Sequence, residues 1–240
     1  MALHATMKYL PFKQLIKQVS NVTNEIHLHV GDSITSRAVN TSNTVLVDVD
    51  IPSSSFEQYK CDKPIDAAID VSKILPFLNL TYGFVTICID EYSVNLLSGK
   101  FALNIAVLKK DTVKKEPNSS PLKFEGSSSV EAVKLRGFMK ESSKFGDKVR
   151  VTIGGYGKPT TEFLVLDDDS NELEFTIDSG FLGNDGKISS LYSIELIKDV
   201  INHTTGIIDI ELSDNHPIKL GTKIGEFGKV TYLVAPRIES

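Results

Sequence analysis

The side chains that could support catalysis do not form a catalytic motif in this sequence. No Gly-x-Ser-x-Gly segment is present, so the sharp turn that exposes the nucleophilic serine of many hydrolases is missing. The glycine-rich run at 154–158 (GGYGK) resembles a phosphate-binding loop, but a proline follows Lys158 and no helix is predicted after it. We therefore expect a hairpin turn there and no enzymatic activity.

Two groups of metal-binding residue types are also present. His27 and His29 lie two positions apart in a predicted strand and share one face, but no Cys, Asp or Glu cluster completes a ligand set. Three acidic residues at 167–169 lie in a turn with Ser and Asn, where carboxylates commonly accept backbone hydrogen bonds. We expect a solvated histidine face and a structural turn, with no metal or other cofactor. A histidine metal pair and a metal-binding loop are the alternatives.

Basic residues on predicted helices give a stronger signal. In the helix predicted over Ser129–Phe145, Arg136, Lys140 and Lys144 recur at every fourth position with no acid between them on that face, opposite an apolar stripe that includes Leu135. The cations that we expect on the polar faces of the four predicted helices are Lys13, Lys17, Lys73, Arg136, Lys140, Lys144 and Lys198. Such faces favour contact with phosphates without recognition of bases, and an ordinary solvated helix face is the alternative.

Composition limits the class of protein. The chain has 240 residues and a net charge of −5, which argues against a protein that coats nucleic acid with its whole surface. Its two cysteines, Cys61 and Cys88, are too few for a disulfide framework, and we expect buried, reduced thiols. The N-terminus lacks the pattern of a signal peptide and no apolar run is long enough for a membrane span. We expect a soluble, intracellular protein that does not bind membranes.

The elements that position these residues recur in two halves. The segment Val71–Asp90 has the same pattern as Ser193–Leu212, and Phe12–Val30 has the same pattern as Leu135–Ile153: an amphipathic helix followed by an alternating strand. Pro76 lies inside the helix predicted near Val71–Leu78, so that helix must be short or distorted.

The predicted strands of both halves alternate apolar and polar residues. They are Glu25–Val30, Ile34–Val39, Thr44–Ile51, Ile65–Val71, Phe84–Asp90, Ser93–Leu97 and Phe101–Leu108, then Val149–Ile153, Thr161–Leu166, Glu172–Asp178, Gly186–Ser190, Ile207–Leu212, Ile218–Ile224 and Val230–Val234. The charged, Pro- and Ser-rich stretch Lys109–Pro121 predicts an exposed linker between domains 1–108 and 122–240. The pattern predicts an α+β fold, with antiparallel sheets on one side and helices packed across them.

Three segments resemble one family. The C-terminal stretch Gly228–Glu239 is similar to the final strand and tail of archaeal and eukaryotic DNA sliding clamps, the proliferating cell nuclear antigen family. Residues Asn40–Asp48 and Ile51–Tyr59 resemble the family's Asp-x-Ser-x-x-x-Leu segment and its Phe-x-x-Tyr sequel, and Pro217 lies in a third matching position. The order and spacing of these segments agree with the family along the whole chain.

The resemblance implies a ring of three subunits around duplex DNA, held without sequence specificity. Each subunit would have two similar clamp domains, with the sheets outside and the seven helix cations facing DNA. The ring would act as a processivity factor in DNA replication and repair, opened by a clamp loader, and would tether DNA polymerase, flap nuclease and ligase through a short peptide motif. The expected peptide pocket comprises Val39, Leu46, Leu122, Pro217, Leu233, Ala235, Pro236 and Ile238. The expected subunit interface comprises Phe101, Leu103, Ile105, Val107, Leu173, Phe175 and Ile177.

The chain departs from the family where the inner helices usually carry lysine or arginine. It has Pro76, Asn79, Asn202 and Gly137 there, which predicts a less basic central hole. Leu233 replaces a tyrosine usual beside the peptide pocket. A subunit of a heterotrimeric or checkpoint-type ring is one alternative, and a monomeric β-rich binding protein or hydrolase is another. The resemblance predicts a cytoplasmic protein if the source is archaeal and a nuclear one if it is eukaryotic.

Overall fold

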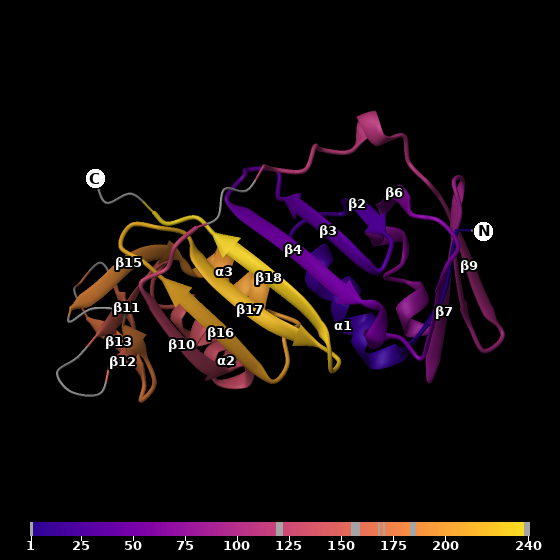
Figure 1. Ribbon diagram of the computed structural model, residues 1–240. Helices are drawn as coiled ribbons and strands as arrows, with labels where there is room; N and C mark the ends of the chain where they lie inside the picture. Colours follow the sequence, from indigo (N-terminus) through magenta and orange to yellow (C-terminus); the bar gives the residue numbers. More distant parts are fainter. Residues whose placement is uncertain are drawn as a thin grey trace. The chain divides into compact units, whose positions relative to one another are not determined.

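The structure, a computed structural model, describes residues 2–118, 122–154, 159–167, 169, 171–182 and 186–237. The chain divides into two compact units. Unit 1 comprises residues 1–118 with 223–230, and unit 2 comprises residues 119–222 with 231–240. Figure 1 shows helices behind strands in each unit, as expected for layered α+β domains.

Unit 1 contains two groups of antiparallel strands. One has the order β5-β1-β7-β8-β9 and the other contains β4-β3-β2-β6. The bounds of these strands are β1 (Leu3–Lys8), β2 (Glu25–Val30), β3 (Ser33–Val39), β4 (Val45–Pro52), β5 (Gln58–Cys61), β6 (Ile65–Asp70), β7 (Phe84–Ile89), β8 (Ser93–Ser98) and β9 (Phe101–Ala106).

The remaining strands repeat this topology strand for strand, and most of their residues are in unit 2, although residues 223–230 of β17 and β18 and their turn group with unit 1. The order β14-β10-β16-β17-β18 matches β5-β1-β7-β8-β9, and β13-β12-β11-β15 matches β4-β3-β2-β6. The bounds are β10 (Gly126–Glu131), β11 (Lys148–Gly154), β12 (Thr160–Leu166), β13 (Glu172–Ile177), β14 (Phe181–Leu182), β15 (Lys187–Ser193), β16 (Ile207–Leu212), β17 (Ile218–Ile224) and β18 (Gly228–Val234). The duplication predicted from the sequence is therefore present in the order of the strands.

Helices cover one face of the strands in each unit. Helix α1 (Tyr9–Ser20) buries Phe12, Ile16 and Val19, one apolar stripe, and Pro11 fits its first turn because the early N–H groups of a helix need no partner within it. Helices α2 (Ala132–Ser142) and α3 (Ile194–Ile201) pack against each other in unit 2. In Figure 1 they lie behind β16 and β17.

The counterpart of α3 in unit 1 is not an α-helix. It consists of two 3₁₀ turns, η2 (Val71–Lys73) and η3 (Phe77–Asn79), with Pro76 immediately before the second. The described residues contain two other 3₁₀ turns, η1 (Ser53–Ser55) and η4 (Lys110–Thr112). The prediction of a short or distorted helix is confirmed.

Strand alternation produces the core. In β1 the side chains of Leu3, Ala5 and Met7 are at most 1% exposed, while the residues between them face outward. In β11 the side chains of Val149 and Val151 are likewise fully buried. Burial of each such large aliphatic side chain stabilises the fold by about 1.5–3 kcal/mol.

Some sequence-based predictions of elements are wrong. Strands β1, β5, β10 and β14 were not predicted, and the helix predicted from Ser129 begins at Ala132, because Gly126–Glu131 pairs with β16 instead. Ser128 lies in that strand, and its hydroxyl donates a hydrogen bond to the Ser179 carbonyl oxygen at 2.8 Å. This serine is therefore held by a contact with a distant part of the chain. The expected turn at 155–158 lies outside the described residues.

Candidate DNA, partner and subunit surfaces

The unit 1 cations predicted to face DNA lie on α1 and on the 3₁₀ turn packed against it. Lys13 and Lys17 are half-buried on α1, and the Lys13 ammonium lies 5.3 Å from the centroid of the Tyr9 ring. Lys73 is exposed on η2, and its Nζ lies 4.0 Å from an Asp70 carboxylate oxygen. The structure therefore brings the three cations to neighbouring elements.

The unit 2 cations lie on the α2–α3 pair, except Lys144, which lies just after the end of α2. Lys140 and Lys144 are exposed, while Arg136 and Lys198 are half-buried. The Arg136 guanidinium donates to the Thr204 carbonyl oxygen in the turn after α3. One of its donors therefore holds α2 to the segment that follows α3.

The prediction of a cationic row without an interleaved acid is wrong at Lys144. Its Nζ lies 2.7 Å from Oε2 of Glu141, three residues earlier. Lys144 also follows the end of α2 and does not continue its face. The hydrogen bond from Lys144 lowers the pKa of the Glu141 carboxyl. The negative charge of Glu141 partly offsets the cationic row.

The two strands predicted to join subunits are both at edges of their sheets. β9 is the outer neighbour of β8, and β13 is the outer neighbour of β12. On β9, Phe101 is 40% exposed, Leu103 is half-buried and Ile105 is buried, and Val107 follows the strand. On β13, Leu173, Phe175 and Ile177 are all half-buried. An unpaired edge presents backbone donors and acceptors to another chain.

The residues of the predicted peptide pocket come from both units. In unit 1, Val39 on β3 and Leu46 on β4 are direct cross-strand partners, and both are half-buried. Their side chains form a small, accessible apolar pair on that sheet.

In unit 2, the predicted pocket residues lie before β17 and around the end of β18. Pro217 immediately precedes β17, Leu233 is in β18, and Ala235 and Pro236 follow it, all half-buried. Leu122 is 38% exposed. Ile238 lies outside the described residues. Arg237, which follows Pro236, donates its backbone N–H to the Leu191 carbonyl oxygen, and its guanidinium lies 2.6 Å from a carboxylate oxygen of Asp147. These contacts fix the tail to this unit.

The linker predicted from its composition is exposed along most of its length but is also anchored to unit 1. The Leu108 N–H donates to the Ala68 carbonyl oxygen at 2.7 Å, and the Val113 side chain is buried. The Lys114 ammonium lies 2.8 Å from the carbonyl oxygen of Asn40 and 2.6 Å from Oδ1 of Asn43. These contacts are tertiary and have no signature in the local sequence.

The candidate metal and thiol residues have structural roles where they are described. Asp167 accepts hydrogen bonds from the backbone N–H groups of Asp169 and Asn171, as expected of a turn, and Asp168 lies outside the described residues. Within the described ranges, no group of three or more His, Cys, Asp or Glu side chains is arranged to hold a metal ion. The cysteines are half-buried rather than buried, and both are free thiols. No helix in the described part of the chain is both long and apolar enough to cross a membrane.

Comparison with known proteins supports the resemblance. Residues 6–98 match the model of the N-terminal domain of proliferating cell nuclear antigen. The DNA polymerase sliding clamp of Methanocorpusculum labreanum is 27% identical over 246 residues, covering 99% of both chains. That of Archaeoglobus fulgidus is 26% identical over 244 residues, covering 95% of both.

Solved structures show the same fold. Proliferating cell nuclear antigen of A. fulgidus, determined with the C-terminal region of FEN-1 bound, superposes with a TM-score of 0.90 at 23% identity over 99% of both chains. The protein from Entamoeba histolytica gives a TM-score of 0.85 at 16% identity, again over 99% of both chains. Together with the duplicated sheets, these matches show that the chain is similar along almost its whole length to archaeal DNA polymerase sliding clamps and has the fold of proliferating cell nuclear antigen.

Proposed function

We propose that this chain is a sliding clamp that encircles duplex DNA as a ring of three subunits and has no catalytic activity of its own. The observation that carries the proposal is the duplicated topology, which leaves β9 and β13 at free edges of two separate sheets. A contact between two different surfaces repeats from copy to copy and closes into a ring when the rotation allows. Pairing β9 of one copy with β13 of the next would use both edges.

The apolar residues on these edges support the same contact. Phe175 on β13 packs against Phe138 and Phe163, with ring centroids 5.4 and 6.0 Å apart. This aromatic cluster holds the edge strand to its own unit and leaves Phe175 half-buried. The remaining exposed area of Leu173, Phe175 and Ile177 is available for Phe101, Leu103 and Val107 of a neighbouring copy, whose burial would add apolar stabilisation.

DNA would lie against the helical side of each unit. Lys13, Lys17 and Lys73 in unit 1 and Arg136, Lys140, Lys144 and Lys198 in unit 2 are proposed to face phosphates directly or through water. Contacts of this kind carry no sequence information and permit movement along the duplex. The acidic balance of the whole chain would then discourage binding of DNA to the outside of the ring.

Partner enzymes would bind through a short peptide. The bound FEN-1 region in the A. fulgidus relative favours this mode, and in this chain we assign it to Val39, Leu46, Leu122, Pro217, Leu233, Ala235, Pro236 and Ile238. DNA polymerase, flap nuclease and ligase are the proposed clients, with a clamp loader to open the ring. A few buried apolar anchors would supply most of the affinity of so small an interface.

The assembly test is light scattering coupled to size exclusion, over a dilution series of the purified protein. A mass of three subunits supports a homotrimer. A monomer that assembles only with related clamp subunits would favour the heterotrimeric or checkpoint-type alternative. A monomer that forms no ring under either condition would refute the ring. Retention on closed circular DNA, with release after linearisation, then tests encirclement.

A further inference from the structure

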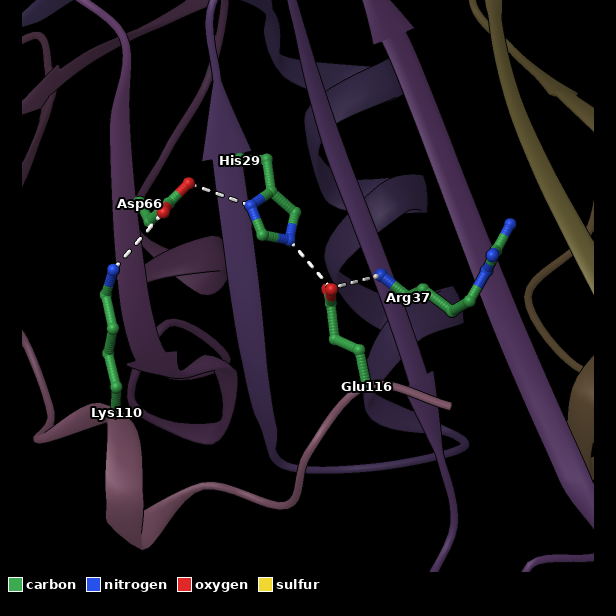
Figure 2. Close-up of polar contacts among 5 residues, drawn as sticks. All are labelled: His29, Arg37, Asp66, Lys110 and Glu116. Atoms are coloured by element: carbon green, nitrogen blue, oxygen red, sulfur yellow. Dashed lines mark hydrogen bonds and ion pairs between the residues drawn. The ribbon is translucent and has the colours of Figure 1, made fainter. Parts of the chain in front are cut away.

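A chain of charged groups connects the linker to the surface of unit 1 through one histidine. His29 lies on β2, and its Nδ1 is 2.8 Å from Oδ1 of Asp66 on β6. Its Nε2 is 2.9 Å from Oε2 of Glu116, in the linker. Figure 2 shows the two carboxylates on opposite sides of the ring, so the three groups do not converge on one point as metal ligands would.

Further charges complete the surroundings of His29. The other oxygen of Asp66 lies 3.2 Å from the Lys110 ammonium, also in the linker. Oε1 of Glu116 accepts the backbone N–H of Arg37 on β3 at 3.3 Å, and the Arg37 guanidinium pairs with Asp48 on β4. The linker is therefore held at both Lys110 and Glu116, with the imidazole between the two carboxylates (Figure 2).

This arrangement suits only one protonation state of the ring. A neutral imidazole has one N–H and can donate to one carboxylate, which leaves the lone pair of its other nitrogen facing the second carboxylate. An imidazolium donates to both. Charge-assisted hydrogen bonds of this kind are stronger than neutral ones.

We propose that His29 is a positioning residue for the linker: its imidazolium form clasps the segment Lys110–Glu116 to unit 1, and its deprotonation loosens that segment. The proposal concerns the linker itself and does not depend on the assigned peptide pocket. The Lys114 contacts with Asn40 and Asn43 form a second anchor in which the histidine takes no part.

The direction in which the pKa of His29 is shifted agrees with the proposal, because a raised pKa favours the imidazolium form. It is raised from its ordinary value of 6.5, mainly by the hydrogen bond with Asp66 and also by Glu116, against an opposing effect of partial burial. Release of the linker removes Glu116, so the pKa is higher when the linker is bound than when it is free. The extra stability of the bound linker is complete below the pKa of the released state and is lost as pH rises through the raised pKa.

The test is hydrogen exchange of the linker in the full-length protein at about pH 6 and about pH 8, corrected for intrinsic exchange rates, together with an NMR titration of His29. The reporters are the N–H groups of Thr112 and Val113, which bond to the carbonyl oxygens of Lys109 and Lys110 at 3.0 and 3.4 Å. Because the pairs are partly exposed, we expect wild-type protection to fall about two- to five-fold between the two pH values.

Variants distinguish the loss of the His29 contacts from a general loosening of the linker. His29→Gln should give low protection at both pH values. Lys114→Gln should lower protection by the same factor at both, because its contacts with Asn40 and Asn43 do not involve the histidine. His27→Gln, whose cross-strand partner is Ala68 rather than Asp66, should behave as wild type. If His29→Gln proves unfolded by thermal melt, Glu116→Gln gives the same information: it should abolish the pH dependence and lower the pKa of His29.

Two results would overturn the proposal. One is wild-type protection that stays constant across a range in which His29 is seen to titrate. The other is unchanged pH dependence in His29→Gln or Glu116→Gln.

Discussion

Replacement of Ala106 by proline should separate the ring into subunits without unfolding them. Ala106 is the last residue of β9, and its cross-strand partner is Ser93. The next residue, Val107, donates its N–H to the Tyr92 carbonyl oxygen at 2.8 Å. Hydrogen-bonded and non-hydrogen-bonded pairs alternate along an antiparallel ladder, so the Ala106 N–H points away from β8, to the side where the proposed neighbouring copy would pair.

The size of the effect follows from the lost donor. Proline would leave a carbonyl oxygen of the neighbouring β13 without its partner, at a cost of about 1–3 kcal/mol for each interface. That corresponds to association weaker by about 5- to 150-fold. The fold itself loses no ladder hydrogen bond, and an edge strand tolerates proline, so the free energy of unfolding should change by no more than about 0.5 kcal/mol.

Light scattering over a dilution series measures the strength of association between subunits, and urea unfolding measures the free energy of unfolding. Ala106→Thr keeps the N–H and is the matched control, which should remain assembled. A proline variant with wild-type mass at every concentration would refute the pairing through β9. A variant that is monomeric but also unfolded would show that the N–H is needed within the subunit, which contradicts the orientation deduced here.

Two further predictions concern the DNA and peptide surfaces. Lys140→Gln should lower the slope of log affinity for DNA against log salt by up to about one, and Lys144→Gln by less, because Glu141 already pairs with Lys144. The slopes are measured by anisotropy titrations over a salt series, and equal slopes for both variants and wild type would contradict the DNA assignment. Lys100→Gln in the β8–β9 turn is the charge-matched control. Leu46→Glu should abolish calorimetric binding of a Gln-x-x-aliphatic-x-x-aromatic-aromatic peptide with the assembly intact, whereas Leu166→Glu, at an exposed leucine, should not. Undiminished heat with Leu46→Glu would mean that the pocket lies elsewhere.

Many strand positions were predictable from an apolar face, although β1, which buries Leu3, Ala5 and Met7 on one face, was missed. The segment 44–51 (TVLVDVDI) alternates cleanly, and β4 occupies 45–52 with Val45, Val47 and Val49 buried. In contrast, β10 has the sequence GSSSVE, in which serines pair with distant backbone groups and provide no apolar period. A local pattern cannot report such contacts, since the partners are supplied by the fold.

The candidate surfaces were predictable to different degrees. Helical spacing correctly placed Lys13 and Lys17 on one helix, because the periodicity is local. The pairing of Lys144 with Glu141 was missed, although their spacing of three is itself a sequence signal. The contact between His29 and Glu116 joins residues 87 positions apart, and nothing in either neighbourhood indicates it.

Pro76 offers a test of whether sequence or packing determines the missing helix of unit 1. Proline in the interior of a regular helix costs about 3 kcal/mol, so its removal would be strongly stabilising if the rest of the segment favoured a helix. The segment has instead adapted to it. Pro76 has φ −62° and ψ −37°, which proline adopts without strain, and the Leu78 N–H reaches the Ile74 carbonyl oxygen at 3.2 Å across it.

Pro76→Ala would lose about 0.4–1 kcal/mol of stability through greater freedom of the unfolded chain and gain about 0.5–1.5 kcal/mol from a new backbone hydrogen bond. The two nearly cancel, so we expect a net change within about 1 kcal/mol in urea unfolding. A stabilisation near 3 kcal/mol would show that the proline alone prevents a helix like α3, and that the adapted turns described here are strained.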